Sequence, residues 1–520
     1  MAQVINSNIS SLNSQRNLTS SQSALSTSLQ RLSSGLRINS AKDDAAGLAI
    51  SERFTSQIRG NTTAARNAND GISLAQTAEG GLSTAGDLLQ RIRELAVQSA
   101  NGSNSSSDRS SIQNEVNALS KELDRVATTT QFNGQNVLDG SQISTQFQVG
   151  ANSGQTINIG VQSAKATDIG NNTIKPTDTA TSMSQVLAGA SGTNLDSDVV
   201  NRMPAAGGKL TVTSGTGNKQ DIFLTGTDAA ATPPTVGDTA KSIANKVNGA
   251  TGTTGVTAQA KTTATIASIA DGAVNFQLRG ANSTANDPNS KAVTISSKVV
   301  GGDLTALAQA VNAQSSTTNI TATVKLDSTG KKELQLVDST GNDIQLSAQD
   351  GDVAMQTAQL RGADVAGAPG AALAMTVNTT NVVGGRVEFS ADSGFSILDS
   401  TGSVTGATTN VGSDLQSVST IDVSTVDGAN AALSTIDSAL NQVNSNRAAL
   451  GAIQNRFAST ISNLNTATEN LSASRSRIQD TDFASETATL TRGQILQQAG
   501  TAMLAQANSL PNGVLSLLRG

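Results

Sequence analysis

The sequence predicts an α+β chain of several domains, with long helices at both ends and a β-rich middle region that contains duplicated small α+β modules. Three observations support this prediction. Apolar residues recur at helical spacings of three and four near both ends of the 520-residue chain. Between about Phe132 and Val426, Gly, Thr, Ser and Asn dominate, and short stretches alternate apolar and polar residues. Within this middle region, two similar segments recur at one constant offset.

The N-terminal part predicts a series of helices. Ile5, Ile9 and Leu12 begin a heptad-like stripe that five leucines continue, with one phase slip near Arg16. Farther along, two periodic segments flank a polar loop and predict a helical hairpin, with Ser107 or Asp108 capping its second helix. The five leucines are Leu18, Leu25, Leu29, Leu32 and Leu36, and the hairpin residues are Leu88, Ile92, Leu95, Ile112, Val116, Leu119, Leu123 and Val126.

The C-terminal part predicts one very long helix. Apolar residues from Leu433 to Ile478 recur at spacings of three, four and seven over more than six heptads. A helix of this length cannot bury its stripe alone, so it needs partner helices. The N-terminal helices are the natural partners, and we therefore expect the two ends of the chain to meet.

The middle region predicts strands and an internal repeat. Segments such as Lys209–Thr213 and Glu333–Val337 alternate in the manner of half-buried strands. Each repeat unit is expected to be a short helix followed by strands, and two copies indicate duplicated modules inserted into a helical scaffold. The aligned pairs are Ser242–Asn248 with Ala306–Asn312, Val256–Ala260 with Ile320–Val324, and, at a shorter offset, Phe276–Leu278 with Leu334–Leu336.

The composition excludes several classes of function. The chain has no Cys and no His, which removes the usual zinc ligands and the Ser-His-Asp and Cys-His nucleophiles. We therefore expect no catalytic residues, no metal, no cofactor and no enzymatic activity. A net charge of −6 argues against a nucleic-acid partner. No run of apolar residues approaches the roughly 18 that a membrane span needs. The N-terminal residues after Met1 do not resemble a cleavable signal peptide.

The two termini are helical in pattern but carry few charges. Arg16 is the only charged residue from Met1 to Gln30, and Glu486, Arg492 and Arg519 are the only ones from Phe483 onward. A solvated amphipathic helix normally carries charges on its outer face. One interpretation is that these helices dock on their own domain. The other is that they pack against copies of themselves inside an assembly, are disordered in the monomer, and become ordered on assembly. The core-packing residues expected from the second interpretation are Ile5, Ile9, Leu12, Leu496, Met503 and Leu510.

Six motifs, taken in order, resemble signatures of the bacterial flagellins. Three lie within about 150 residues at the front of the chain and three within about 100 at the back. They are Gln30–Ser51, Gln90–Gly102, Gln131–Leu138, Ala448–Phe457, Ile478–Ala484 and Val514–Arg519.

The resemblance implies a subunit that self-polymerises into the extracellular flagellar filament used for swimming. It implies an innermost coiled-coil core, a helical spoke domain and a variable outer region, which gives five parts: 1–42, 43–175, 176–425, 426–480 and 481–520. It also implies secretion by flagellar type III export without signal cleavage. The implied partners are other flagellin subunits, an export chaperone, a cap protein and the hook–filament junction proteins.

The resemblance also implies recognition by host innate immune receptors. The residues that match the contacts of a vertebrate Toll-like receptor are Arg91, Leu95 and Glu115, and Gln30–Ser51 matches a peptide sensed by plant receptors. Packing in the assembly is the alternative role for the same residues. Two other functions remain open at this point: a hook–filament junction protein, and a surface adhesin that binds ligands through 176–425.

Overall fold

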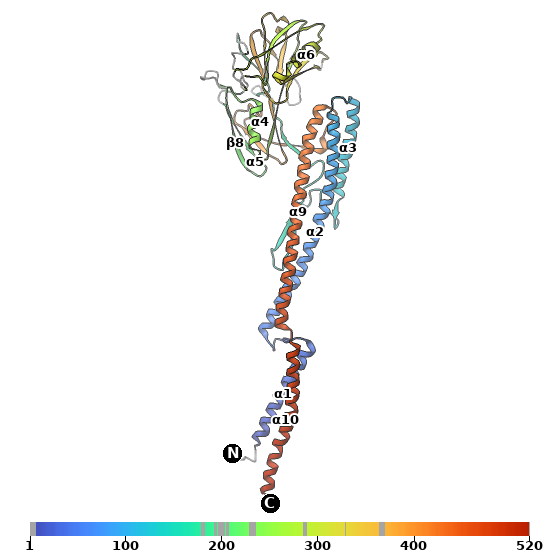
Figure 1. Ribbon diagram of the computed structural model, residues 1–520, viewed down its shortest axis with the longest axis vertical. Helices are drawn as coiled ribbons and strands as arrows, with labels where there is room; N and C mark the ends of the chain where they lie inside the picture. Colours follow the sequence, from blue (N-terminus) through green and yellow to red (C-terminus); the bar gives the residue numbers. More distant parts are fainter. Residues whose placement is uncertain are drawn as a thin grey trace. The chain divides into compact units, whose positions relative to one another are not determined.

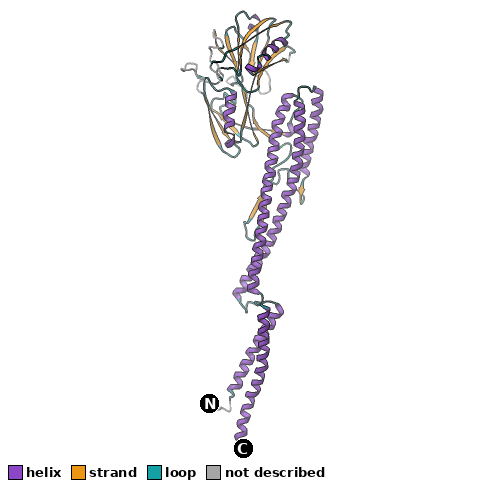
Figure 2. Cartoon of the chain, viewed as in Figure 1, coloured by secondary structure: helices purple, strands orange, loops and turns teal. Residues whose placement is uncertain are grey.

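The computed structural model describes residues 7–177, 182–191, 195, 203, 207–227, 236–283, 286, 289–327, 329–362 and 370–518. They fall into two compact units. The terminal unit comprises Met1–Gly80, Gln131–Gln162 and Arg447–Gly520, and the middle unit comprises Gly81–Thr130 and Ser163–Asn446. Figure 2 shows long helices in both units and most of the strands in the middle unit.

Helices from both ends of the chain build the terminal unit. Helix α1 (Ile9–Ser34) and helix α10 (Phe483–Leu518) lie side by side (Figure 1). The first part of α2 (Ala45–Ala100) and the last part of α9 (Val426–Gln479) belong to the same unit. The predicted long C-terminal helix and the predicted meeting of the two ends are therefore confirmed. Two small hairpins complete the unit: β1 (Gln131–Phe132) with β2 (Gln135–Asn136), and β3 (Thr145–Gln148) with β4 (Thr156–Ile159).

Local signals set both ends of α1. The Asn8 side chain accepts a hydrogen bond from the Ser11 N–H and caps the first turn. Gly35 ends the helix in the left-handed region at φ 72°, and its N–H donates to the Arg31 carbonyl at 2.8 Å. α2 begins only at Ala45, so a connection of ten residues separates the two helices.

A phenylalanine lies in the core of the terminal unit. Phe457 on α9 is fully buried, and its ring meets Phe147 on β3 edge to face, with centroids 5.8 Å apart and planes at 87°. Gly71 on α2 lies directly against this ring, where a Cβ atom would come within 2.7 Å of Phe457 Cζ. A side chain at position 71 would therefore collide with the core.

The helical part of the middle unit contains the predicted hairpin. It is formed by α2 and α3 (Ser106–Thr129), with the first part of α9 in the same unit. The cap of α3 is Ser105 rather than Ser107 or Asp108. Ser105 accepts from the Asp108 N–H, and the Asp108 side chain accepts from the Ser105 N–H, which makes a capping box. The buried apolar residues include Leu82, Leu89, Ile92, Leu95, Ile112, Val116, Leu123, Ile436 and Val443.

The rest of the middle unit consists of three antiparallel sheets with short helices. A five-stranded sheet has the order β11-β10-β14-β17-β6, and a four-stranded sheet has the order β20-β19-β7-β8. The largest sheet has the order β12-β13-β9-β18-β5-β21, with β15 beside β9 and β16 beside β15. The strands are β5 (Gly170–Ile174), β6 (Val186–Ser191), β7 (Gly208–Thr213), β8 (Lys219–Leu224), β9 (Thr257–Ala267), β10 (Gly272–Arg279), β11 (Val293–Val299), β12 (Ile320–Leu326), β13 (Lys332–Asp338), β14 (Ile344–Ala348), β15 (Gln359–Gly362), β16 (Leu373–Ala374), β17 (Thr379–Val383), β18 (Arg386–Ala391), β19 (Ser396–Asp399), β20 (Asn410–Gly412) and β21 (Asp414–Ser417).

The predicted duplication is present in the structure. The first module contains α4 (Ala240–Gly249), α5 (Thr251–Thr254) and β9, and the second contains α6 (Thr305–Asn312), α7 (Ser315–Thr318) and β12. A left-handed residue, Gly255 or Asn319, precedes the strand in each copy. The shorter-offset match pairs β10 with β13, which belong to different sheets but contribute to the same core. A further helix, α8 (Val353–Gln356), covers that core, and a short 3-10 helix (Val418–Thr420) precedes α9.

Candidate assembly surfaces

Small residues dominate the contact between α1 and α10. A Cβ atom built on Gly500 would lie 3.2 Å from Leu18 Cδ1, and one on Gly493 would lie 3.4 Å from Leu25 Cδ1. The helices therefore approach each other closely at the glycines. We call this contact the seam. It includes Ser11, Ser14, Leu18, Ser21, Leu25, Ser28 and Leu32 of α1, and Glu486, Leu490, Gly493, Gln497, Gly500, Leu504 and Ala507 of α10, both at heptad spacing.

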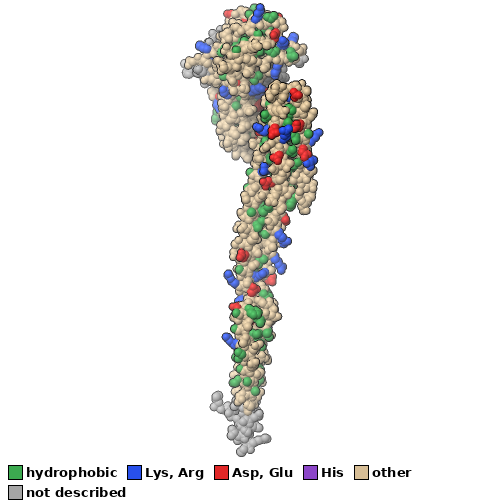
Figure 3. Space-filling model, turned by 45° about the vertical axis from the view of Figure 1, so that its right-hand side comes forward, with side chains coloured by type: hydrophobic (Ala, Val, Ile, Leu, Met, Phe, Trp, Pro, Cys, Tyr) green, Lys and Arg blue, Asp and Glu red, His purple; other side chains and the backbone are tan. Residues whose placement is uncertain are grey.

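The apolar residues predicted to pack in a filament core lie outside the seam. Ile9 is 65% exposed and Leu12 is 55% exposed on α1, and Leu496 is 51% and Met503 62% exposed on α10. Leu510 continues α10 at the same seven-residue spacing as Leu496 and Met503, and Ile5 lies outside the described residues. The exposed side chains of Ile9, Leu12, Leu496 and Met503 are available to something other than the partner helix. Figure 3 shows apolar side chains among uncharged polar ones along these helices.

The expected single stripe with a phase slip is therefore wrong. α1 is one continuous helix, and Ile9 and Leu12 point away from the side that carries Leu18 and Leu25. The apparent slip near Arg16 arose because residues of two different faces were joined into one series. One face packs on α10, and the other is left open.

Backbone hydrogen bonds join the connection between α1 and α2 to the connection between α9 and α10. The Arg37 N–H donates to the Gln479 carbonyl at 2.7 Å, and the Thr481 N–H donates to the Gly35 carbonyl at 3.0 Å. Beside them, the side chain of Asp43 accepts hydrogen bonds from Ser40 and Asn39. The Ser40 and Asn39 N–H groups, the Ser40 hydroxyl and the positive charge of Arg31 hold the pKa of Asp43 below its ordinary value. The connection between α1 and α2 thus has a defined conformation.

The residues matched to a receptor contact do not all lie on the surface. Arg91 and Glu115 are about half exposed and form an ion pair at 2.9 Å, and Arg91 forms a second one with Glu94 at 2.9 Å. The hydrogen bonds that Arg91 donates to Glu94 and then to Glu115 raise the pKa of Arg91. Leu95, in contrast, is only 2% exposed. The Leu95 side chain is part of the helical core in this structure, and its part in a receptor contact stays a prediction.

A groove of about 600 Å³ lies in the terminal unit and was not foreseen from the sequence. Its walls come from three segments that are far apart in the chain: α2, the turn between β3 and β4, and α9. The lining residues are Gln57, Asn61, Val149, Gly150, Ala151, Asn152, Gly154, Gln155, Thr156, Ile157, Arg456, Thr460, Asn463, Leu464, Ala467 and Leu471. The lining includes both apolar and amide-bearing side chains, and the only charged residue among them is Arg456.

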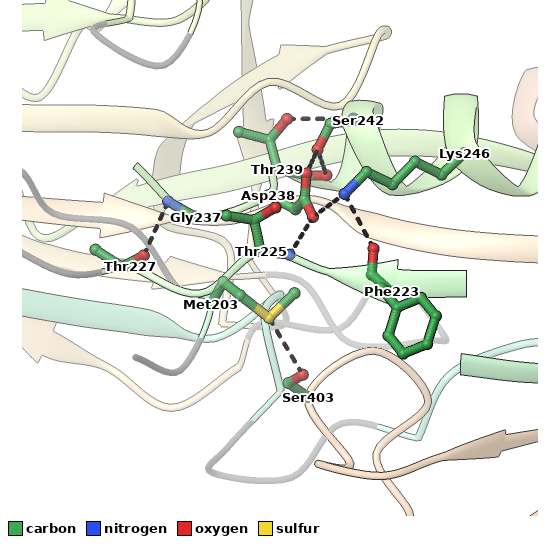
Figure 4. A network of polar contacts seen from close by, with 10 residues as sticks. All are labelled: Met203, Phe223, Thr225, Thr227, Gly237, Asp238, Thr239, Ser242, Lys246 and Ser403. Atoms are coloured by element: carbon green, nitrogen blue, oxygen red, sulfur yellow. Dashed lines mark hydrogen bonds and ion pairs between the residues drawn. The ribbon is translucent and has the colours of Figure 1, made fainter. Parts of the chain in front are cut away.

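A polar network at the start of α4 is structural (Figure 4). Asp238 accepts from the Ser242 hydroxyl at 2.8 Å and from the Thr225 N–H at 2.6 Å, and it pairs with Lys246 at 2.5 Å. Lys246 also donates to the Phe223 carbonyl at 3.1 Å. Its members satisfy one another and fix α4 against β8, so the network offers no free group for chemistry.

Two further properties concern the described residues. No cluster of three acidic, His or Cys residues among them could hold a metal ion. None of their helices combines the length and hydropathy needed to cross a membrane. The exposed apolar faces of α1 and α10 and the groove are therefore the described surfaces best suited to bind a partner.

The comparisons with known proteins agree with one another. Models of the bacterial flagellin N-terminal and C-terminal helical regions match residues 5–143 and 433–518. The B-type flagellin of Pseudomonas aeruginosa is 42% identical over 526 residues, and the flagellin of Salmonella typhimurium is 40% identical over 528 residues. Both matches cover 100% of this chain and 100% of the relative. Among solved structures, FliC from Burkholderia pseudomallei matches at 22% identity and a TM-score of 0.28, over 74% of this chain and 99% of that chain.

Proposed function

Because this chain belongs to the bacterial flagellin family, we propose that it polymerises through its terminal helices into the extracellular flagellar filament that drives swimming. The observation that carries the proposal is the set of exposed apolar side chains on α1 and α10. Ile9, Leu12, Leu496 and Met503 are each more than half exposed. Burying a Leu or Ile side chain contributes about 1.5–3 kcal/mol before entropy is subtracted. Neighbouring copies that cover this face would supply the stabilisation that the narrow seam lacks.

The weak charge of the same helices supports the proposal. The faces beside these residues carry Ser, Thr, Asn and Gln, so many copies can pack closely without like-charge repulsion. We further propose the five-part division 1–42, 43–175, 176–425, 426–480 and 481–520, with the first and last parts in the filament core. Arg91 and Glu115 are proposed as the centre of a receptor-recognition patch.

We propose that the subunit is secreted through flagellar type III export. An export chaperone, a cap protein and the hook–filament junction proteins are its proposed partners. A chain without Cys suits export in an unfolded state, because no disulfide could form before folding. The junction-protein alternative is less well supported, since the relatives that match over the full length are flagellins.

Seeded polymerisation, followed by sedimentation and microscopy, tests the proposed function. The full chain should form long filaments, and a chain lacking residues 1–40 and 481–520 should form none. In a Leu12→Gln, Met503→Gln double variant, the affinity between subunits should fall at least about tenfold. The reason is that a loss of about 1.4 kcal/mol of contact energy corresponds to a factor of ten. Leu326→Gln is the matched control, since Leu326 is 69% exposed on the edge strand β12. Equal polymerisation by the trimmed chain would refute the role of the termini.

A further inference from the structure

Met503 on α10 is the only exposed methionine among those that the structure describes. Its side chain is 62% exposed, and Met1 lies outside the described residues. The other four are each no more than 2% exposed, and they are Met183, Met203, Met355 and Met375. The thioether of Met503 is therefore accessible to small molecules in solution, whereas the thioethers of the other four are not.

The surroundings of Met203 and Met503 differ in the way that matters for reactivity. The Ser403 hydroxyl donates to the Met203 sulfur at 3.7 Å, and both residues are buried (Figure 4). The Met503 sulfur, in contrast, accepts no hydrogen bond from any residue in the described ranges. Its neighbours one turn away on the same side of α10, Ala499 and Gln506, are themselves exposed. A small oxidant therefore reaches Met503 without any local unfolding of the helix.

An accessible thioether reacts with hydrogen peroxide to give a sulfoxide. The sulfur lone pair attacks one oxygen of the peroxide, the O–O bond breaks, and an S=O bond forms. The sulfur is oxidised by two electrons, and the peroxide takes them up. The proton of the attacked hydroxyl passes to the departing hydroxide, which leaves as water. The reaction converts a flexible apolar side chain into a polar one.

Met503 belongs to an apolar series along α10. Leu496 lies seven residues before it and Leu510 seven residues after it, so the three share one side of the helix. Leu496 is 51% exposed, and like Met503 it lies outside the seam with α1. A sulfoxide at position 503 places a hydrogen-bond acceptor within this apolar series. Because burying a polar group without a partner is unfavourable, oxidation opposes the covering of this side by another protein surface.

We propose that Met503 is a site of oxidation by peroxides, and that its sulfoxide form excludes the subunit from assembly. The assembly part of the inference rests on the proposed function, in which neighbouring copies cover Leu496 and Met503. The same covering protects Met503 after the subunit is incorporated, because peroxide no longer reaches the sulfur. Oxidation therefore acts on free subunits rather than on filaments, and methionine sulfoxide reductases reverse it.

Peroxide treatment followed by peptide mapping and seeded elongation tests both parts. The full-length chain is treated with hydrogen peroxide as free subunits and as filaments, and mass spectrometry quantifies the sulfoxide at each methionine. Treated subunits are freed of peroxide and added to seeds to measure elongation. Met503→Leu removes the exposed thioether, and Met375→Leu, which removes a buried one, is the matched control. Each variant is compared with its own untreated sample, so any effect of the substitution on assembly itself cancels.

In free subunits, Met503 should be oxidised at least about tenfold faster than the four buried methionines, because their sulfurs react only after local opening. Incorporation into filaments should slow the oxidation of Met503 about tenfold or more for the same reason. Peroxide should reduce elongation by the parent chain and by Met375→Leu at least about tenfold, because the sulfoxide opposes burial, and Met503→Leu should keep its untreated rate. Reductases for both sulfoxide epimers should restore elongation by the oxidised parent.

Three results would overturn the inference and leave the proposed function intact. The first is equal oxidation of Met503 and the buried methionines in free subunits. The second is elongation by the oxidised parent at the untreated rate, and the third is a Met503→Leu chain as sensitive to peroxide as the parent. A parent chain that forms no filaments under any condition overturns the proposed function together with the assembly part, while the peptide map of free subunits still decides the oxidation part.

Discussion

The side-chain amide of Asn248 bridges both backbone groups of Ala258. It donates to the Ala258 carbonyl at 2.9 Å and accepts from the Ala258 N–H at 2.7 Å. Asn312 bridges Ala322 in the second module with the same two distances, 2.9 and 2.7 Å. Each bridge ties the end of a helix to the start of the following strand. The duplication thus preserves a specific contact as well as the order of elements.

Replacing this asparagine should destabilise the outer modules. Asn312→Ala removes two hydrogen bonds and should lower the free energy of unfolding by about 1–3 kcal/mol, at about 0.5–1.5 kcal/mol per bond. Asn248→Ala should act similarly in the first module. Asn245→Ala is the control, because Asn245 is exposed on the same type of helix and not part of the bridge. Denaturant unfolding followed by circular dichroism measures the effect, and identical midpoints for all three variants would contradict it.

Two glycines of α2 should respond in opposite ways to the same substitution. Gly71→Ala places a Cβ atom within 2.7 Å of Phe457 Cζ and should destabilise the terminal unit by about 1–3 kcal/mol through overpacking. Gly80→Ala meets no atom within 4 Å and should stabilise the helix by about 0.5–1 kcal/mol. Thermal unfolding of both variants beside the parent is the measurement. A stabilised Gly71→Ala protein would show that Phe457 does not occupy this position.

Acid should loosen the connection between α1 and α2. The pKa of Asp43 is lowered in the folded chain, so its contribution to stability is present above its ordinary pKa of 3.8 and is lost as the pH falls through the lower folded value. Hydrogen exchange at Asn39 and Ser40, whose N–H groups donate to Asp43, should therefore accelerate below about pH 3.8. Asp43→Asn should exchange rapidly there at neutral pH as well. Exchange rates independent of pH in the parent chain, after correction for intrinsic chemistry, would exclude this role.

The proposed receptor patch predicts different roles for neighbouring residues. Arg91→Ala and Glu115→Ala each remove half of a surface ion pair and should reduce receptor signalling about tenfold with little change in the free energy of unfolding, since exposed pairs contribute about 0–1 kcal/mol. Leu95→Ala should instead lower the free energy of unfolding by about 2–5 kcal/mol because Leu95 is buried. Arg125→Ala, which breaks the exposed pair with Glu122 on α3, is the control. Unchanged signalling by the Arg91 and Glu115 variants would refute the patch.

The burial of Leu95 could have been predicted from its spacing. Leu88, Ile92 and Leu95 follow one helical series, and Ile92 and Leu95 are both buried. A residue within an apolar series is more often core than contact surface, and here the periodicity was the better guide. Arg91 and Glu115, which the resemblance singled out, are about half exposed, and their part in receptor recognition stays a prediction.

The seam and the groove could not be predicted, for different reasons. Four of the seven α1 seam positions are Ser, as at Ser11 and Ser28, so a search for apolar periodicity passes over them. Glycines on α10 make room for Leu18 and Leu25, and that complementarity is visible only when both helices are seen together. The groove needs Asn61, Val149 and Leu464 in one place, which no local pattern relates. The heptads, by comparison, were predictable because burial imposes a period along a single helix.

The composition of the seam also predicts which helices unfold locally most easily. Three leucines of α1, Leu18, Leu25 and Leu32, supply its main apolar contacts, and the remaining positions are mostly Ser. Such a pair buries little apolar surface, so amides of α1 and α10 should exchange fast in the monomer while those of α2 around Gly71 are protected. Polymerisation should slow exchange in α1 and α10 by about a hundredfold or more, because neighbouring copies then bury Ile9, Leu12, Leu496 and Met503 and local opening must expose them. Hydrogen exchange with mass spectrometry on monomer and filament makes the comparison, with Leu326 on β12 as an internal reference that should not change. Equal protection of α1 in both states would mean that the seam alone stabilises the helices, and the open apolar face would then need another explanation.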